Sequence, residues 1–208
     1  MSHRSFISVV IAVALLACAC GAATTGGGAS PRGTAQGTGA GPTATIETPL
    51  GNIVIRLTPE TAPIAETNFV TLARSGYYDG VVFHRIAPDF VIQGGDGQYG
   101  HASALDAARL GLGGPGYAIK DEPVIGEYLR GTVAMARTPA PDSAGSQFFI
   151  CLADLSARLD KAGGYVIFGQ VVSGMDVVDA IAAGPNSGPP ANRALTPMPM
   201  TRVTISSP

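Results

Sequence analysis

The feature that most constrains the fold of this chain is a series of short apolar runs, which begins at residue 44 and continues almost to the C-terminus. In the run that ends at Leu57, Ile53 and Ile55 share one side of the chain with that leucine, whereas Val54 takes the other side. Alternation with a period of two is typical of a half-buried β-strand. Turn-forming residues separate the runs, with 28 glycines and 16 prolines in 208 residues. The chain therefore favours many short strands over long helices.

Two stretches have the periodicity of a helix instead. Apolar residues recur at helical spacing within residues 58–76 and again within residues 174–184. We expect Thr58 or Thr61 to cap the first helix, and Ser173 to open the capping pattern of the second. Short strands with two separated helices predict a closed antiparallel barrel with helical covers. The predicted strands lie within residues 45–57 (two runs joined by a turn), 81–86, 90–95, 131–137, 146–152, 165–172 and 200–205.

The charge of the chain argues against nucleic acid as a partner. The formal net charge is −2, and the sequence contains no basic run or stripe. A nucleic-acid-binding domain normally carries a strongly basic patch. Apolar residues make up 46% of the chain, which is enough for one domain with a sizeable core.

The N-terminal part of the chain is not expected to belong to the fold. Residues 1–17 have a short polar start and an apolar stretch shorter than the ~20 residues that span a bilayer, which indicates a signal peptide. The sequence LLAC that ends at Cys18 resembles a bacterial lipobox, in which the cysteine is lipidated; an ordinary cleaved signal peptide is the alternative. Residues 18–43, almost entirely Gly, Ala, Ser, Thr and Pro, predict a flexible tether. Residues 44–208 would then form a domain outside the cytoplasm, anchored to the cell membrane by the lipid, or secreted if lipidation fails.

The cysteines do not suggest a disulfide framework. Cys18 and Cys20 both lie near the predicted anchor, and Leu15 has the better spacing for Cys18. Cys151 is flanked by apolar residues, as in a buried strand, and no histidine is close to it in the sequence. We expect Cys151 to be a buried free thiol without a catalytic role.

One stretch, FHRIAPDFVIQGGD at residues 83–96, places an arginine among apolar residues. Together with GGPGYAIKDE, GSQFFICLA and YVIFGQVVSGMDVVDAI, it resembles the cyclophilin family of peptidyl-prolyl isomerases. The resemblance covers nearly all of residues 45–206, and its motifs are long and follow the order found in the family. It implies an eight-stranded antiparallel β-barrel closed by two helices, and catalysis of cis/trans exchange at X–Pro peptide bonds.

This reaction explains why an arginine would lie in apolar surroundings. Rotation about a peptide bond meets a barrier of ~18–20 kcal/mol, because conjugation is lost midway. No bond breaks, so no nucleophile, metal or cofactor is needed. In the twisted amide the proline nitrogen regains a lone pair, and a fixed guanidinium can donate to it only in that state. We expect Arg85 to have this role, with no carboxylate neutralising its charge.

The resemblance also implies the remaining site residues, each by its position in a motif. Phe90 and Phe149 correspond to aromatic walls of the proline pocket, and Gln93 to a glutamine that orients the arginine. Tyr165 stands where many members have histidine, and Ala136 where the backbone pairs with the bound peptide. The expected catalytic residues are Arg85, Gln93 and Phe90, and the expected substrate-binding residues are Val91, Ala136, Arg137, Gln147, Phe149, Leu159 and Tyr165.

Taken singly, these residues have simpler interpretations. An apolar strand residue such as Phe149 is usually part of a core, and an isolated Arg85 would more often pair with an acid such as Asp89 or Asp96. Their common order and context favour the site. His84, which is next to Arg85 on a predicted strand, should point to the opposite face and be a hydrogen-bonded structural residue.

The chain departs from the family pattern at several positions. Arg137 stands at the groove edge, where asparagine is common. Residues 97–113 form a longer loop than usual, which either restricts substrates or is a tolerated surface insertion. Arg158 replaces the indole that binds cyclosporin in drug-sensitive members. This replacement predicts weak cyclosporin binding, and a submicromolar dissociation constant by calorimetry would refute the prediction.

The sequence therefore predicts a peptidyl-prolyl cis-trans isomerase that acts on proline-containing segments of exported or cell-surface client proteins. We expect a monomer that contacts the membrane only through its lipid anchor. The alternative from another class is a catalytically weak proline-segment binding module or chaperone. A secreted hydrolase is disfavoured, because no serine or cysteine has a credible histidine partner in the sequence.

Overall fold

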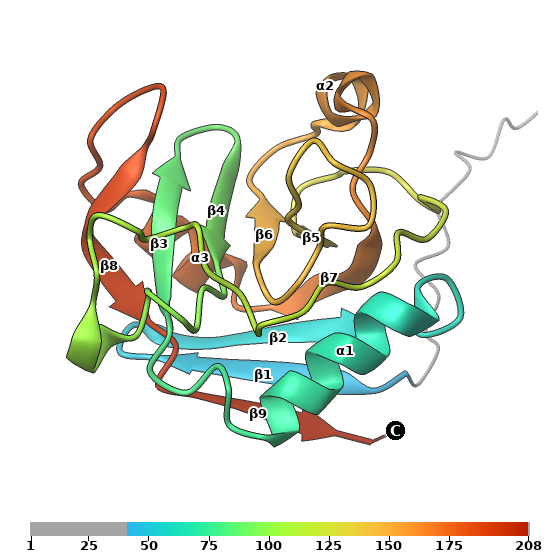
Figure 1. The fold of residues 1–208 in the computed structure, drawn as a ribbon, viewed down its shortest axis with the longest axis horizontal. Coiled ribbons are helices and arrows are strands. Elements are labelled where there is room, and N and C mark those ends of the chain that lie inside the picture. Colours follow the sequence, from blue (N-terminus) through green and yellow to red (C-terminus); the bar gives the residue numbers. More distant parts are fainter. Residues whose placement is uncertain (1–40, 208) are drawn as a thin grey trace, which may run out of the picture. The chain divides into compact units, whose positions relative to one another are not determined.

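The computed structural model describes residues 41–207, whose strands form one antiparallel sheet curled into a half-barrel (Figure 1). The order of the strands in the sheet is β8-β3-β4-β6-β5-β7-β2-β1-β9. The predicted signal peptide, the candidate lipidation site Cys18 and most of the tether lie outside the described residues. The strands are β1 (Thr43–Thr48), β2 (Gly51–Leu57), β3 (Val82–Ala87), β4 (Val91–Gly94), β5 (Thr132–Met135), β6 (Phe148–Cys151), β7 (Ile167–Ser173), β8 (Arg193–Pro199) and β9 (Arg202–Ser206). The helices are α1 (Pro63–Arg74), α2 (Ser156–Leu159) and α3 (Met175–Ala182), with short 3-10 helices at Ala102–Ala104 and Asp160–Ala162.

The prediction of a mainly β fold is confirmed, but the sheet has nine strands where eight were expected. The sequence analysis does not predict β8, because this strand contains Pro197 and Pro199, which have no N–H to donate. Prolines are tolerated there because β8 lies at the edge of the sheet and pairs with β3 on one side only. The expected closure of the barrel is not confirmed, since β8 and β9 end the sheet and no pairing joins them within the described part of the chain.

Both faces of the sheet are buried near its centre, which creates two apolar clusters. Strand β6 shows this arrangement, because Phe148 and Ile150 belong to the main core, whereas Phe149 and Cys151 belong to a second, smaller cluster. Successive strand residues point to opposite faces, so a strand that is covered on both faces is apolar throughout. The main core includes the apolar sides of α1 and α3, and the second cluster forms the floor of the site described below.

Helix α1 is capped by a residue that is distant in the sequence. The backbone N–H groups of Ile64 and Ala65 donate to the two carboxylate oxygens of Glu122, each at 2.8 Å. Neither Thr58 nor Thr61 provides a side-chain cap, so the predicted capping of this helix is wrong. A carboxylate at this position satisfies free N–H groups and also interacts favourably with the helix dipole.

Helix α3 also lacks the cap that the sequence predicts. Ser173 is the last residue of β7, and the helix follows Gly174, which has a φ of 86° and provides no side chain. A Cβ at Gly174 would collide with the backbone oxygen of Asn52, so the close approach of α3 to β2 requires glycine. Within residues 41–207, no helix is both long and apolar enough to cross a membrane.

Candidate active site

An irregularity in strand β3 presents Arg85 to the site. Phe83 pairs with Gly94 of β4, but Arg85 pairs with Gln93, so that His84 is an extra residue on β3. Such a β-bulge interrupts the strict alternation of a strand and re-aims the side chains next to it. The cross-strand partners Arg85 and Gln93 are in contact, and Arg85 Nη1 donates to Gln93 Oε1 at 3.3 Å.

Pairing across the sheet brings most of the predicted site residues to one cavity. Gln93 pairs with Phe149 of β6, which in turn pairs with Ala134 of β5, so these residues share one face of the sheet. A cavity of about 110 Å³ opens on this face. We call it the apolar pocket; it is lined by Arg85, Phe90, Val91, Gln93, Ala136, Arg137, Phe149, Leu159 and Tyr165. All of these are predicted site residues, and of the predicted set Gln147 alone does not line this pocket.

The guanidinium of Arg85 is half-buried and has no carboxylate partner among residues 41–207. Burial lowers the pKa of Arg85 below its ordinary value, and the positive charge of Arg158 lowers it further. The two ion pairs found within residues 41–207 lie elsewhere, so pairing of Arg85 with Asp89 or Asp96 does not occur. The charge of Arg85 is therefore available to a group that enters the pocket.

Asp96 has a different role, at the start of the loop that follows β4. Its carboxylate is fully buried, and Oδ2 accepts hydrogen bonds from the backbone N–H groups of Gly111 and Gly113, at 2.7 and 3.1 Å. Oδ1 accepts from two backbone N–H groups at the beginning of the same loop. One buried carboxylate thus holds both ends of the long loop that the sequence analysis notes at residues 97–113.

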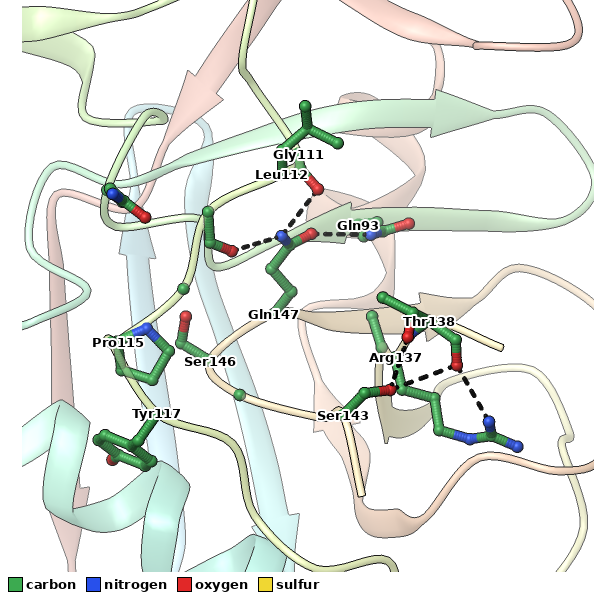
Figure 2. Close-up of a pocket in the computed structure, with 16 residues that line it drawn as sticks. Gln93, Gly111, Leu112, Pro115, Tyr117, Arg137, Thr138, Ser143, Ser146 and Gln147 are labelled. Carbon is green, nitrogen blue, oxygen red and sulfur yellow. Dashed lines mark hydrogen bonds between the residues drawn. The ribbon is translucent and has the colours of Figure 1, made fainter. Parts of the chain in front are cut away.

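A chain of hydrogen bonds fixes the orientation of both site glutamines (Figure 2). Gln147 Nε2 donates to the backbone oxygens of Gly111 and Gly113, at 3.0 and 2.8 Å, so its Oε1 faces Gln93. Gln93 Nε2 donates to that oxygen at 3.0 Å, which leaves Gln93 Oε1 to accept from Arg85. Because an amide has one donor end and one acceptor end, each of these bonds dictates the next. The loop backbone therefore determines which end of Gln93 meets Arg85.

A second and larger cavity adjoins the apolar pocket. It has a volume of about 510 Å³ and shares Gln93, Ala136 and Arg137 with the apolar pocket. We call it the loop pocket; its other lining residues are Gln98, residues 111–117, Thr138, Ser143, Gly145, Ser146 and Gln147. Figure 2 shows Pro115 and Tyr117 on one side of this cavity, and Arg137, Thr138 and Ser143 on the other. The 97–113 loop therefore contributes a wall directly beside the candidate site.

Arg137 lines both pockets and is tied to the backbone. Its guanidinium donates to the carbonyl oxygens of Gly163 and Gly164, at 3.0 and 2.9 Å. It also lies 5.4 Å from the centroid of the Tyr165 ring, which packs edge-on against Phe149. The side chain that the sequence places at the groove edge therefore joins two loops.

His84 is buried, and its Nδ1 has no hydrogen-bond partner within the described residues. Burial lowers the pKa of His84 to about 4; the nearby carboxylate of Asp96 opposes this shift and Arg85 adds to it. The ring packs beneath the loop, where a Cβ on Gly111 would come within 3.4 Å of His84 Nε2. His84 is therefore neutral at pH 7 and supports the wall of the loop pocket.

Cys151 is the buried free thiol that the sequence predicts. It is fully buried, and burial raises the pKa of the thiol to about 12. A thiol that stays protonated at pH 7 is a poor nucleophile. Cys151 pairs with Val91 across the sheet and packs in the second cluster, so its role is to support the apolar pocket.

The side chains that surround the predicted site residues were not predicted from the sequence. The role of Asp96 could have been found, since aspartate at the start of a glycine-rich segment commonly accepts from a backbone N–H two residues on. The guanidinium of Arg158 lies 3.9 Å from the centroid of the Phe90 ring. No sequence signal predicts this contact, because the two residues are far apart along the chain.

Comparison with protein families gives a match over most of the chain. A family described as "Cyclophilin type peptidyl-prolyl cis-trans isomerase/CLD" matches residues 43–205. A peptidyl-prolyl cis-trans isomerase of Acinetobacter baylyi is 43% identical over 168 residues, which are 78% of this chain and 84% of the relative. A probable peptidyl-prolyl cis-trans isomerase of Brucella suis is 39% identical over 187 residues, which are 86% of this chain and 87% of the relative.

Solved structures give the same result at the level of the fold. A cyclophilin-type peptidyl-prolyl cis-trans isomerase of Cryptosporidium parvum, crystallised in the presence of the dipeptide Ala-Pro, has a TM-score of 0.67 to this chain. Its sequence is 29% identical, and the match covers 80% of this chain and 99% of that structure.

Proposed function

This chain belongs to the family of cyclophilin-type peptidyl-prolyl cis-trans isomerases, and from this premise we propose which of its residues carry the reaction and where it acts. The enzyme interconverts the cis and trans forms of X–Pro peptide bonds. In our proposal the proline enters the apolar pocket, and Arg85 donates a hydrogen bond to the proline nitrogen when the amide is twisted.

The observation that carries this assignment is the state of the Arg85 guanidinium. It is half-buried in an apolar cavity, and its side-chain hydrogen bond goes to a neutral acceptor, Gln93 Oε1. A carboxylate partner would compete with a weak acceptor such as an amine lone pair, and Arg85 has none within 4 Å in residues 41–207. The planar amide nitrogen is a poor acceptor, so the bond strengthens only as the amide twists. Arg85 therefore favours the transition state over both planar forms.

The remaining residues of the apolar pocket hold the proline in place. Phe149 and Leu159 are almost fully buried and offer apolar surface to the ring, while Phe90 is more exposed and forms a wall beside Arg85. Gln93 keeps the guanidinium oriented through the hydrogen bond to its Oε1. The backbone of Ala136, at the boundary of both pockets, is placed to pair with an extended peptide.

Proline-containing peptide segments are the proposed substrates. The related Cryptosporidium structure was determined in the presence of Ala-Pro, which supports this class of ligand. The apolar pocket is small and has an apolar floor that includes Val91, Phe149 and Leu159, which suits it to the proline ring. Selectivity for neighbouring residues then depends on the cavities on either side of it.

The proposal is tested by exchange NMR on a short Ala-Pro-Phe-type peptide with the native protein and with Arg85→Ala. We expect the native protein to accelerate isomerisation and Arg85→Ala to lose about 100-fold or more in kcat, with peptide affinity little changed. Arg85→Ala could instead lower kcat/KM only in proportion to the loss of peptide affinity, with kcat unchanged. The arginine would then serve binding, and the proposed mechanism would be wrong.

The alternative is a binding module or chaperone that holds proline segments with little turnover. It predicts peptide binding without acceleration in the same experiment. The intact Arg85–Gln93 pair favours the enzyme, because a protein that only binds has no need of a donor aimed at the proline nitrogen.

We further propose that the enzyme is a lipid-anchored monomer outside the cytoplasm, where it acts on exported proteins whose X–Pro bonds limit their folding. The lipobox-like sequence before Cys18 and the Gly-rich tether support this location. Cys18→Ala should move the protein from the membrane fraction to the soluble fraction, whereas Cys20→Ala should not. Retention of the Cys18→Ala protein in membranes would contradict lipid anchoring at Cys18.

A further inference from the structure

A third cavity lies next to the apolar pocket, on the side away from the loop pocket. It has a volume of about 440 Å³, and Arg85 and Phe90 line it as well as the apolar pocket. The loop pocket shares neither of these residues. We call this cavity the arginine pocket; its walls include Arg85, Phe90, Arg158, Pro189, Pro190 and Asn192.

Two guanidiniums meet at the ring of Phe90 in this pocket. The Cζ atom of Arg158 lies 3.9 Å from the ring centroid and that of Arg85 lies 5.7 Å from it. Stacking on an aromatic face restrains an arginine without neutralising its charge. The Arg158 side chain is therefore held at the pocket wall although the residue itself is exposed.

The two arginines of the pocket have no carboxylate partner among the residues that line it. No acidic residue lines the cavity, and neither arginine takes part in an ion pair within residues 41–207. The positive charge of Arg158 lowers the pKa of Arg85, which shows that the two charges are close enough to repel each other. An anion beside Arg158 would offset part of this repulsion and gain a charge-assisted hydrogen bond, while the guanidinium of Arg85 stays available to the proline nitrogen.

We propose that the arginine pocket binds the carboxylate of an aspartate or glutamate in the substrate, within two residues after the proline. This inference rests on the proposed function and deepens it, because it names a preferred class of substrate. The preferred segments are then proline followed closely by an acidic residue.

The distance fits a neighbouring residue of the same peptide. The side chain of Phe90 is a wall of both cavities, so a proline in the apolar pocket is one side chain away from the arginine pocket. An extended chain advances about 3.3–3.6 Å per residue, and one or two residues cover such a separation. A carboxylate further along the peptide would have to fold back to reach Arg158.

The arrangement of the three cavities offers the peptide a path on each side of the proline. The apolar pocket shares residues with the loop pocket on one side and with the arginine pocket on the other. We place the residues before the proline on the loop-pocket side, beside the backbone of Ala136, which lines the apolar pocket and the loop pocket but not the arginine pocket. The residues after the proline therefore extend toward Arg158.

The experiment compares kcat/KM for pairs of peptides that differ only by glutamate or glutamine, with blocked termini so that no other charge is present. In two of the peptide pairs, the glutamate or glutamine is the first or the second residue after the proline. In a third pair, it stands before the proline. We expect glutamate to be favoured about threefold over glutamine after the proline at low ionic strength, and less in high salt. Arg158→Gln should bring this ratio to about one, and Arg158→Glu should reverse it. For the pair changed before the proline, Arg158→Gln should leave the ratio as it is.

A matched control removes the same charge elsewhere. Arg202→Gln on β9 lowers the net charge equally at an exposed position outside the three cavities, and the ratio should persist in that variant. A ratio of one in the native protein, with turnover intact, would overturn the proposal and leave the proposed function standing. A preference that survives Arg158→Gln, or that Arg202→Gln also abolishes, would overturn it as well. If no peptide is turned over, the proposed function fails, and the ratio of dissociation constants measured by calorimetry with the same peptides decides the proposal about the pocket.

Discussion

The apolar pocket and the loop pocket adjoin each other and share three residues, but they are built in different ways. The walls of the apolar pocket include Val91 and Phe149, whose strands have a hydrogen-bonded neighbour on each side. The wall of the loop pocket at residues 111–117 belongs to no strand, and side chains from elsewhere fix it, namely Asp96 and Gln147.

From this difference we associate the apolar pocket with the reaction and the loop pocket with the choice of substrate. A side chain on a paired strand is held more firmly than one on a loop, which suits the donor that we propose for the proline nitrogen. A loop held by a few hydrogen bonds tolerates change and can differ between related proteins without loss of the sheet. The two regions still communicate, because the Gln147–Gln93 hydrogen bond joins the loop backbone to the acceptor of Arg85.

The largest effect is expected where a carboxylate is placed against Arg85. Gln93→Glu replaces a neutral acceptor with a charged one, which would hold the guanidinium in an ion pair and away from the proline nitrogen. Removing one donor from a transition state typically costs 10²–10³ in rate, so we expect kcat/KM to fall about 100-fold, mainly through kcat. Exchange NMR at several peptide concentrations separates kcat from KM.

Gln147→Glu makes the same change in charge on the side of the loop pocket. It removes the two hydrogen bonds to Gly111 and Gly113, so it should raise KM more than it lowers kcat. Equal losses of kcat in Gln147→Glu and Gln93→Glu would show that the two pockets act as one unit. That result would contradict the distinction between them.

The next effect concerns two adjacent glycines of the loop pocket. A Cβ at Gly113 would collide with the carboxylate of Asp96, whereas a Cβ at Gly114 would meet no atom within 4 Å. Gly113→Ala should therefore lower the free energy of unfolding by about 1–3 kcal/mol, and Gly114→Ala should change it by less than about 0.5 kcal/mol. Urea unfolding measures both. Equal stability of the two variants would mean that Asp96 does not hold this wall.

Low pH should lower the free energy of unfolding, because His84, which supports the loop pocket, becomes protonated. Its folded-state pKa is about 4, below the ~6.5 of an unfolded histidine, so folding favours the neutral form. This stabilisation is fully present above pH 6.5 and is lost as the pH falls toward 4, by about 1–2 kcal/mol between pH 7 and pH 5. Among the groups that face His84, Asp96 opposes the shift, and Arg85 and Arg193 add to it.

The measurement is urea unfolding of the native protein and of His84→Gln at pH 7 and pH 5. Glutamine does not titrate, so the loss of stability between the two pH values should be smaller in the variant by that amount. The backbone N–H of Gly111, a residue on which an added Cβ would come within 3.4 Å of His84 Nε2, should report the change by NMR before residues of the apolar pocket do. An identical pH dependence in both proteins would exclude His84 as the cause.

The smallest effect is expected at a residue that both pockets share. Arg137→Ala removes hydrogen bonds to Gly163 and Gly164, but leaves the backbone of Ala136 in place. Since these bonds are partly exposed and the peptide is expected to pair with backbone, kcat/KM should change by less than about threefold. The same exchange experiment measures it, and a tenfold loss would place the Arg137 side chain in the site.

The predicted site residues that line one cavity, the apolar pocket, were recognisable in the sequence for a reason that particular residues make clear. Phe149 and Val91 belong to strands whose apolar character is local, and the family resemblance adds their order along the chain. The nine residues that line this cavity are all predicted site residues. What the sequence analysis did not predict was the β-bulge at His84, because strict alternation is the simplest pattern for a strand.

The elements that were predicted wrongly depend on partners far away in the chain. Glu122 caps α1 from another part of the molecule, so the nearby threonines are not needed. Strand β8 contains two prolines, which argue against a strand until its edge position is known. For α1, a residue adjacent in the sequence was the natural candidate for the cap, and a distant one took its place.

The sequence by itself determined the mainly β fold, the family and the set of residues that come together around Arg85, since these follow from local patterns and from the order of motifs along the chain. Only the tertiary structure decided how those residues are oriented. It placed the buried carboxylate of Asp96 against the loop backbone. Hydrogen bonds through Gln147 and Gln93 then connect this backbone to Arg85. Arg158 is stacked on Phe90. The physical reason is that a hydrogen bond or a stacked cation needs an exact distance and direction, which the chain acquires only when distant segments pack against each other.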